Sequence, residues 1–351
     1  MDRVELEEKI KEAIVELAKE PEKVEHYHKL ANLYAMEKNY DKIISVYEGL
    51  LNVNPNDTDA LMNLGSLAFY RKNYEKAIEY YLKVLDIKPN DYILYFNIGN
   101  VHAELKNFSK ALYFYNRALD YNPSNPEIYN VMGLLFHDFE DFVEAKIYYE
   151  KALSLDPNSI NAHIDLGNIY FKESEYEKAM EHYKKVLELS PNDKTVVICV
   201  ANILVATKNK KEAFKYFDKA LKMDENNYKT YVCMAIAYSE FMEYDKAEEI
   251  YKLLIEKYPK NINPHILLGN LYSNIKKHDK ALNQYQKALE IDPSKASVHM
   301  LIANTYYIKQ NIEEALTSYR KAIRFEPDND EYKLVYIQIL DEYISKKEEN
   351  K

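Results

Sequence analysis

Glycine and cysteine are scarce in this sequence, and neither a long apolar run nor an excess of positive charge is present. Six glycines and two cysteines occur in 351 residues. These numbers exclude a glycine-rich phosphate-binding loop and a disulfide framework. No apolar run approaches the roughly 20 residues that cross a bilayer, and residues 1–8 lack the basic and then apolar pattern of a secretory signal. We therefore expect a cytoplasmic protein with no transmembrane segment.

The charge balance is acidic. Asp and Glu total 57 against 47 Lys and Arg, which gives a net charge of −10. Proteins that bind the phosphate backbone need a positive surface, so nucleic acid is a poor candidate partner. A chain of 351 residues also exceeds the size at which one hydrophobic core stops growing. The protein is therefore either multidomain or an elongated repeat.

A repeat of 34 residues organises the chain. Prolines recur at this interval, with Glu225 as the one interruption: Pro55, Pro89, Pro123, Pro157, Pro191, Pro259, Pro293 and Pro327. If each of these residues is position 32 of a repeat, nine repeats follow without insertion or deletion. Their predicted bounds are 24–57, 58–91, 92–125, 126–159, 160–193, 194–227, 228–261, 262–295 and 296–329.

Each repeat has the residue pattern of two packed helices. Position 8 is Gly or Ala in all nine repeats, position 20 is Ala in eight of them with Ile43 as the exception, and position 24 is always Tyr or Phe. Small residues at positions 8 and 20 let two helix axes approach closely, and the aromatic ring at position 24 fills the space beside them. Proline at position 32 ends the second helix, and position 34 supplies Asp, Asn or Ser as an N-cap in most repeats. A single helical hairpin cannot bury its apolar face, so neighbouring repeats must stack.

The two ends of the chain are predicted to be capping helices. Residues 1–23 carry an apolar stripe, and residues 330–351 form a final helix and tail. The expected packing residues are Leu6, Ile10, Ala13, Ile14 and Leu17 at the start, and Leu334, Tyr336, Ile337, Leu340 and Ile344 at the end. Such caps keep a repeat array soluble.

The spacing and residue choices strongly resemble the tetratricopeptide repeat, over residues 24–329. The resemblance implies an all-α fold, a right-handed superhelical solenoid of antiparallel helix pairs. In that family the first helices line a concave groove. The sixth repeat departs from the pattern, with Glu225 in place of proline, Lys210 at position 17 and a β-branched first helix from Thr195 to Val200. Two interpretations stay open, a weak repeat and a hinge.

The resemblance also places candidate binding residues in the groove. Position 9 is Asn in six repeats, and an amide both donates and accepts hydrogen bonds, so it can hold a peptide backbone. The predicted polar residues are Asn32, Asn63, Asn97, Asn100, Asn168, Asn202, Asn270 and Asn304. The predicted apolar residues are Met62, Phe69, Phe96, Ile164, Phe171, Ile198, Ile266, Met300 and Tyr307. The alternatives are that position 9 packs or caps neighbouring helices and that position 5 is half-buried between them. The pattern does not complete the chaperone-tail clamp of the family, because His28, Ile93 and Asn97 occupy its cationic positions.

No residues are predicted to be catalytic or to bind a metal, and no cofactor is expected. The histidines at position 4 (His163, His265 and His299) are predicted to pack, and Cys199 and Cys233 are predicted to be unpaired thiols. The favoured function is a non-enzymatic scaffold or adaptor that binds one or more proteins or peptides in its groove, within a larger assembly or as a homo-oligomer. The alternatives are a regulatory or substrate-selecting subunit of a separate enzyme such as a glycosyltransferase and, more remotely, an RNA-binding helical repeat.

Overall fold

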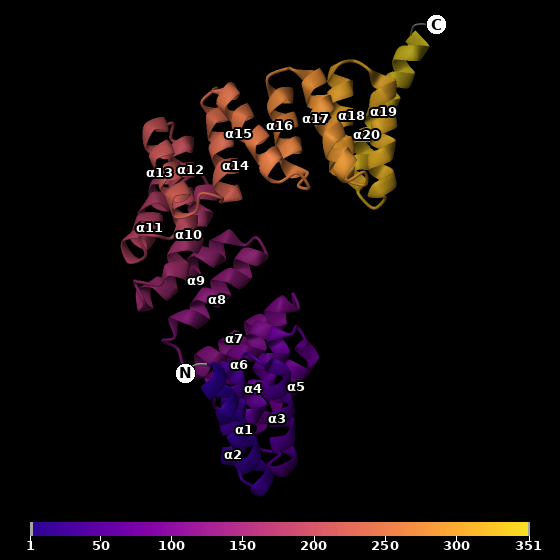
Figure 1. The fold of residues 1–351 in the computed structure, drawn as a ribbon. Helices are drawn as coiled ribbons and strands as arrows, with labels where there is room; N and C mark the ends of the chain where they lie inside the picture. Colours follow the sequence, from indigo (N-terminus) through magenta and orange to yellow (C-terminus); the bar gives the residue numbers. More distant parts are fainter. Residues whose placement is uncertain (1–2, 350–351) are drawn as a thin grey trace. The chain divides into compact units, whose positions relative to one another are not determined.

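The computed structural model describes residues 3–349 and is entirely helical over that range (Figure 1). It confirms the predicted all-α repeat architecture, since pairs of antiparallel helices follow one another at intervals of 34 residues. The helices are α1 (Arg3–Lys19), α2 (Val24–Met36), α3 (Tyr40–Val53), α4 (Thr58–Tyr70), α5 (Tyr74–Ile87), α6 (Tyr92–Glu104), α7 (Phe108–Tyr121), α8 (Pro126–Asp138), α9 (Phe142–Leu155), α10 (Ile160–Lys172), α11 (Tyr176–Leu189), α12 (Lys194–Ala206), α13 (Lys210–Met223), α14 (Tyr228–Glu240), α15 (Tyr244–Lys257), α16 (Asn263–Asn274), α17 (His278–Ile291), α18 (Ala296–Ile308), α19 (Ile312–Phe325) and α20 (Asp330–Glu349).

The two helices of a repeat approach closely at position 8. A Cβ atom added to Gly99 would lie 2.6 Å from ring atoms of Tyr115, and one added to Gly133 would lie 2.7 Å from ring atoms of Tyr149. Both distances are shorter than a carbon–carbon van der Waals contact. The glycine at position 8 therefore makes room for the aromatic ring at position 24 of the same repeat.

A left-handed residue at position 15 ends every first helix. The amide of Lys38 donates to the carbonyl of Ala35, and the amide of Asn39 donates to the carbonyl of Tyr34, at 3.0 and 2.9 Å. This pair of bonds is the Schellman motif, which usually has glycine at the left-handed position. None of the nine left-handed residues here is glycine: they are Lys38, Lys72, Lys106, Glu140, Ser174, Lys208, Met242, Lys276 and Gln310.

Position 4 ties a repeat to the repeat before it. The Tyr95 hydroxyl donates to the carbonyl of Pro89 at 3.0 Å, and the Tyr129 hydroxyl donates to that of Pro123 at 3.0 Å. His163 and His299 use Nε2 in the same way toward Pro157 and Pro293, at 3.2 and 3.0 Å. In these four repeats the position-4 side chain therefore satisfies the backbone carbonyl of the proline that precedes it.

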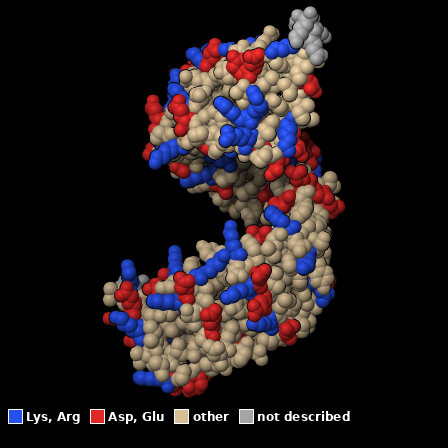
Figure 2. Space-filling model, turned by 90° about the vertical axis from the view of Figure 1, so that its right-hand side faces the viewer, with Lys and Arg blue, Asp and Glu red and all other residues tan. Residues whose placement is uncertain are grey.

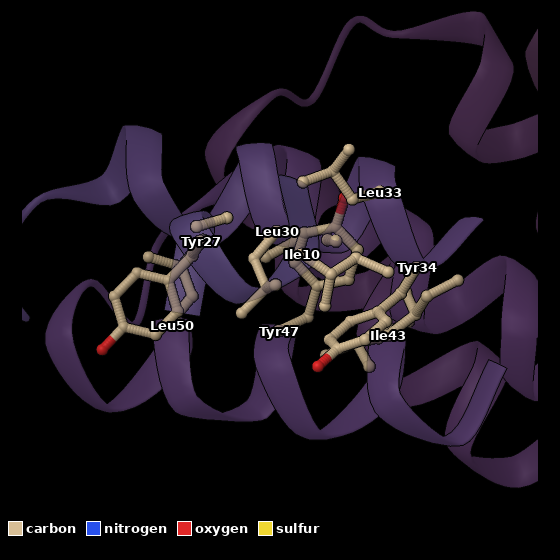
Figure 3. Packing of buried hydrophobic residues seen from close by; sticks show 12 residues of the cluster. Ile10, Tyr27, Leu30, Leu33, Tyr34, Ile43, Tyr47 and Leu50 are labelled. Atoms are coloured by element: carbon tan, nitrogen blue, oxygen red, sulfur yellow. The ribbon is translucent and has the colours of Figure 1, made fainter. Parts of the chain in front are cut away.

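The chain forms two compact blocks, Met1–Ser174 and Glu175–Lys351, which we call the N-terminal and C-terminal blocks. The boundary lies between the two helices of the fifth repeat. In the N-terminal block, Ile10 of α1 packs among Leu30 of α2 and Tyr47 of α3 (Figure 3). In the C-terminal block, α14 to α18 share a core that includes Tyr251 and Tyr285. Each block has its own hydrophobic interior.

The sixth repeat is helical in spite of its β-branched residues. Helix α12 buries Val196, Val197, Val200 and Ile203. Tertiary burial therefore overrides the local preference of these residues for a strand. The weak-repeat and hinge interpretations both stay predictions.

The first capping helix packs mostly as expected, with Ile10 and Ala13 of α1 buried and Leu6 and Leu17 against the same cluster, whereas the last helix turns a partly different face inward. In α20, Ile339 is buried and Tyr336 and Leu340 pack against the same cluster. Three of the expected packing residues, Leu334, Ile337 and Ile344, are instead exposed, and so is Ile14 of α1. Those four expectations were wrong, because a single helix has no repeat register to fix which face is turned inward.

Candidate functional site

The predicted groove residues lie on the first helices of the repeats, in two groups, one in each block. The N-terminal block carries Asn32, Met62, Asn63, Phe69, Phe96, Asn97, Asn100, Ile164, Asn168 and Phe171, on α2, α4, α6 and α10. The C-terminal block carries Ile198, Asn202, Ile266, Asn270, Met300, Asn304 and Tyr307, on α12, α16 and α18. All eight asparagines are exposed or half-buried.

In three repeats the asparagine at position 9 bonds to the tyrosine at position 24 of its own repeat. The Tyr115 hydroxyl donates to Asn100 Oδ1 at 2.8 Å. The same bond joins Tyr285 to Asn270 at 2.7 Å and Tyr319 to Asn304 at 2.6 Å. In the second repeat, where position 9 is Ser66, the Tyr81 hydroxyl donates to the serine oxygen at 3.3 Å. Position 9 therefore supplies the acceptor for a buried phenol, a structural role of the kind left open by the sequence.

This bond fixes the orientation of the amide. Burial raises the pKa of Tyr285 and of Tyr319 to about 12, so both hydroxyls keep their protons at neutral pH and need acceptors. An amide can accept only through its oxygen. The oxygen therefore faces the tyrosine, and the NH₂ group is left for another partner. Within residues 3–349, the NH₂ groups of Asn100, Asn270 and Asn304 form no hydrogen bond.

Repeats without this pair show what it does. In the sixth repeat, position 24 is Phe217, which has no hydroxyl, and the amide of Asn202 lies 4.0 Å from Cys233 Sγ. In the fourth repeat, position 9 is Leu134, and the hydroxyl of Tyr149 is buried without a hydrogen-bond partner in the described chain. The bond therefore needs both a hydroxyl at position 24 and an acceptor at position 9, which Phe217 and Leu134 do not supply.

The asparagines at position 6 are placed differently. The Asn63 amide donates to the carbonyl of Asp59 in its own helix at 2.8 Å, which occupies one of its two N–H groups. Asn97 is half-buried. Sequence reasoning grouped these two residues with position 9, but no tyrosine hydroxyl orients the Asn63 amide.

The apolar groove residues are mostly half-buried. Met62, Phe69, Phe96, Ile164, Phe171, Ile266 and Met300 all have this intermediate exposure. Ile198 does not fit the expectation, because it is only 3% exposed and packs in a cluster with Val197 and Ala201. Tyr307 is half-buried and donates to Glu342 of α20 at 2.9 Å, so its hydroxyl is occupied by the C-terminal helix.

A pocket of about 160 Å³ lies among the first helices of the N-terminal block. Its walls include two predicted residues, Phe69 and Asn100. The pocket also contains residues that the sequence did not single out: Ala103, Glu104, Lys106, Tyr115, Val131, Leu134, Leu135 and Asp138. The sequence feature that could have indicated this pocket is Leu134, an apolar residue at position 9, where most repeats have Asn.

Charges of both signs are interspersed on the surface (Figure 2). Most ion pairs join exposed side chains, as between Lys106 and Asp138 at 2.8 Å. Such pairs contribute little to stability. At the rim of the pocket, the Glu104 carboxylate forms no ion pair with any described residue. The Tyr74 hydroxyl donates a hydrogen bond to it at 3.3 Å.

Histidine and cysteine take structural places. Among the described residues no group of His, Cys, Asp and Glu has the arrangement of a metal site, and no helix is long and apolar enough to cross a membrane. His265 Nδ1 lies 2.9 Å from Gln284 Oε1. Cys199 and Cys233 are free, and burial raises the pKa of both thiols. Their thiolate forms are therefore disfavoured.

These observations define an all-helical repeat protein, in which stacked hairpins share their apolar faces with their neighbours. Sequence profiles described as tetratricopeptide repeat match residues 57–124, 126–159, 160–193, 200–227, 234–261 and 263–295, and a TPR repeat profile matches residues 303–332. The chain belongs to the tetratricopeptide-repeat family.

Solved structures agree with this assignment. A tetratricopeptide repeat protein from Parabacteroides merdae superposes with a TM-score of 0.60 at 20% identity, over 71% of this chain and 99% of that one. Yeast Tom70 gives a TM-score of 0.55 at 17% identity, over 97% and 93% of the two chains. At these identities the likeness establishes the fold. No curated protein matches the chain by sequence. The repeat is typical of protein-interaction scaffolds, and proteins that carry it bind protein partners.

Proposed function

We propose that this protein is a non-enzymatic scaffold that binds a peptide or helical segment of a partner along its first helices. The supporting observation is the recurrent amide at position 9. Its oxygen is held by a tyrosine, and its NH₂ group has no hydrogen bond within the described chain at Asn100, Asn270 and Asn304. A row of oriented N–H donors suits the carbonyl oxygens of a polypeptide backbone, whatever its side chains.

The half-buried apolar residues supply the second component of binding. Met62 and Phe96 occupy position 5 on successive first helices, and Phe69 lies at the pocket in the same block. Apolar area together with directed hydrogen bonds is the pattern by which grooves bind amphipathic or extended segments. A binding surface of this kind requires no cofactor and no catalytic residue.

The test is calorimetric titration of the full chain with the partner recovered from the native cell by affinity purification. The ladder variant combines Asn270→Ala with Tyr285→Phe and Asn304→Ala with Tyr319→Phe, so that no buried hydroxyl loses its acceptor. Removal of two amide contacts should weaken binding by roughly 5- to 150-fold. The matched control carries only Tyr285→Phe and Tyr319→Phe and keeps both amides.

A second control changes charged residues of the second helices, Lys110→Ala and Glu144→Ala. We expect both controls to bind within about twofold of the parent chain. Equal binding by the ladder variant and the parent, together with weakened binding by the second-helix variant, would move the binding surface to the other face and refute the proposal.

A further inference from the structure

The outer face of the second helices becomes apolar in the third and fourth repeats. In α9, position 18 is Val143 and position 22 is Ile147, and these side chains are 66% and 52% exposed. Tyr113, at position 22 of the preceding repeat, is 58% exposed. The other fifteen of the eighteen residues at positions 18 and 22 of the nine repeats are polar or charged. These three residues therefore break a pattern that otherwise suits contact with water.

Packing within the repeat does not require the apolar residues on the outer face of α9. The buried residues of this helix are Ala145, Tyr149 and Ala152, whereas Val143 and Ile147 lie one turn apart on the exposed side. Single exposed apolar residues are ordinary on a protein surface. Neighbouring ones that form a patch are typical of a surface that another molecule covers.

The charges along α9 indicate which molecule fits. Glu144 lies in the first turn, beside Val143, and Lys151 lies one turn beyond Ile147. At 3.6 residues per turn both charged side chains lie on the same flank of the apolar stripe. Neither forms an ion pair among residues 3–349. A helix that runs antiparallel to α9, with its own acid and base in the same order, would pair both charges, and α9 of a second copy is such a helix.

We infer that α9 is a self-association surface, on which two copies of this chain pair through antiparallel α9 helices about a two-fold axis at Ile147. Ile147 packs against its counterpart in the second copy, and Val143 packs against the aliphatic stem of the opposite Lys151. Glu144 of each copy faces Lys151 of the other. Because the interface is isologous, one such contact is made twice.

The remaining charges of α9 are compatible with this arrangement. On the other flank of the stripe, Glu150 comes level with Lys146 of the second copy, and the Lys146 ammonium also holds Glu173 of its own chain at 2.7 Å. A single helix pair buries less surface than a standard interface, so we expect a dissociation constant of about 1–100 μM. The asparagines of the proposed groove lie on the first helices, so self-association does not rest on the proposed function and leaves those amides free.

The test is sedimentation velocity of the full chain from about 1 to 300 μM, which should show a monomer–dimer equilibrium. Ile147→Asp places two carboxylates at the two-fold axis and should weaken association at least roughly tenfold. The matched control is Ile337→Asp, since Ile337 of α20 is 53% exposed. The control should associate as the parent chain does, and thermal melting followed by circular dichroism shows whether both variants remain folded.

A charge exchange tests the antiparallel arrangement independently of folding. Glu144→Lys and Lys151→Glu, each alone, oppose like charges at both contacts and should weaken self-association by about three- to thirtyfold. An equimolar mixture of the two variants again opposes a cation to an anion at both contacts. The mixture should therefore associate about as tightly as the parent chain.

The contrary outcomes are specific. A chain that stays monomeric up to about 300 μM, or a dimer that Ile147→Asp leaves intact, overturns the inference. Equal loss of association in Ile147→Asp and Ile337→Asp overturns it as well, because the contact would then not be confined to α9. A mixture that associates no more tightly than either charge variant alone refutes the antiparallel pairing on which the choice of a second copy depends.

Discussion

Replacement of Asn100 by alanine should destabilise the third repeat through Tyr115. The mutation leaves the buried Tyr115 hydroxyl without its acceptor at 2.8 Å, at a cost of about 1–3 kcal/mol. Alanine is the better helix former by up to ~0.7 kcal/mol, which reduces the net loss to roughly 0.3–2.3 kcal/mol. From the sequence alone, an exposed helical asparagine would be expected to tolerate this change with almost no loss.

The double mutant Asn100→Ala/Tyr115→Phe distinguishes an asparagine that accepts the Tyr115 hydrogen bond from one that can be replaced without loss of stability. Tyr115→Phe removes the donor, and once it is present Asn100→Ala should no longer destabilise the chain, so the two changes should couple by about 1–3 kcal/mol. Repeat arrays unfold locally, so the assay is hydrogen exchange of the α6 and α7 amides together with urea denaturation. Asn202→Ala is the built-in control, because its position-24 residue is Phe217. Coupling below about 0.3 kcal/mol, or equal stability of Asn100→Ala and Asn202→Ala, would refute the pairing.

Three further predictions follow from the backbone and from burial. Lys72→Gly should raise the free energy of unfolding by about 1 kcal/mol in urea denaturation, because Lys72 is left-handed (φ 58) and glycine lacks the clashing Cβ. Lys72→Ala keeps that Cβ and should give no gain in stability. An equal gain from Ala would contradict this explanation. Gly133→Leu should cost about 1–3 kcal/mol and reduce exchange protection in α8 and α9 first, since an added Cβ lies 2.7 Å from Tyr149; unchanged protection there would mean that the ring has room. Burial raises the pKa of Tyr285 and Tyr319 from 10.0 to about 12. Their contribution to stability should therefore be complete below pH 10 and lost as the pH rises toward 12. If ultraviolet absorbance shows these two phenols titrating near pH 10 in a chain that remains folded, burial does not raise their pKa.

The repeat architecture could be predicted from the sequence because nine repeats report the same constraint. Glycine or alanine at position 8, alanine at position 20 in eight repeats and an aromatic at position 24 are spaced as one packing arrangement requires, and Gly99 against Tyr115 shows that contact in the structure. The capping helices had no such redundancy. Leu334 and Ile337 are apolar, but Ile339 is the residue buried among those of α20 that the structure describes. A single helix with apolar residues on several faces does not specify which face is buried.

The candidate site could be predicted only in part. The exposure of position 9 follows from the repeat register, but its bond to the tyrosine fifteen residues later depends on the side-chain geometry of two packed helices. The pocket at Leu134 depends on a residue that breaks the pattern, and its walls come from α4, α6, α7 and α8 as well as Lys106. The repeat position of Ile198 predicts a groove residue, but in the sixth repeat its side chain is only 3% exposed.

The bond from position 4 to the preceding proline has a consequence for how such a chain changes in length. The acceptor is a main-chain carbonyl, as between Tyr95 and Pro89, so the junction does not depend on which side chains the earlier repeat carries. A repeat that makes this bond can therefore follow any repeat that ends in the same turn. Excision or duplication of a whole 34-residue segment within one block recreates an equivalent junction, whereas a change of any other length destroys it. Evolution can therefore lengthen or shorten this chain by whole 34-residue repeats.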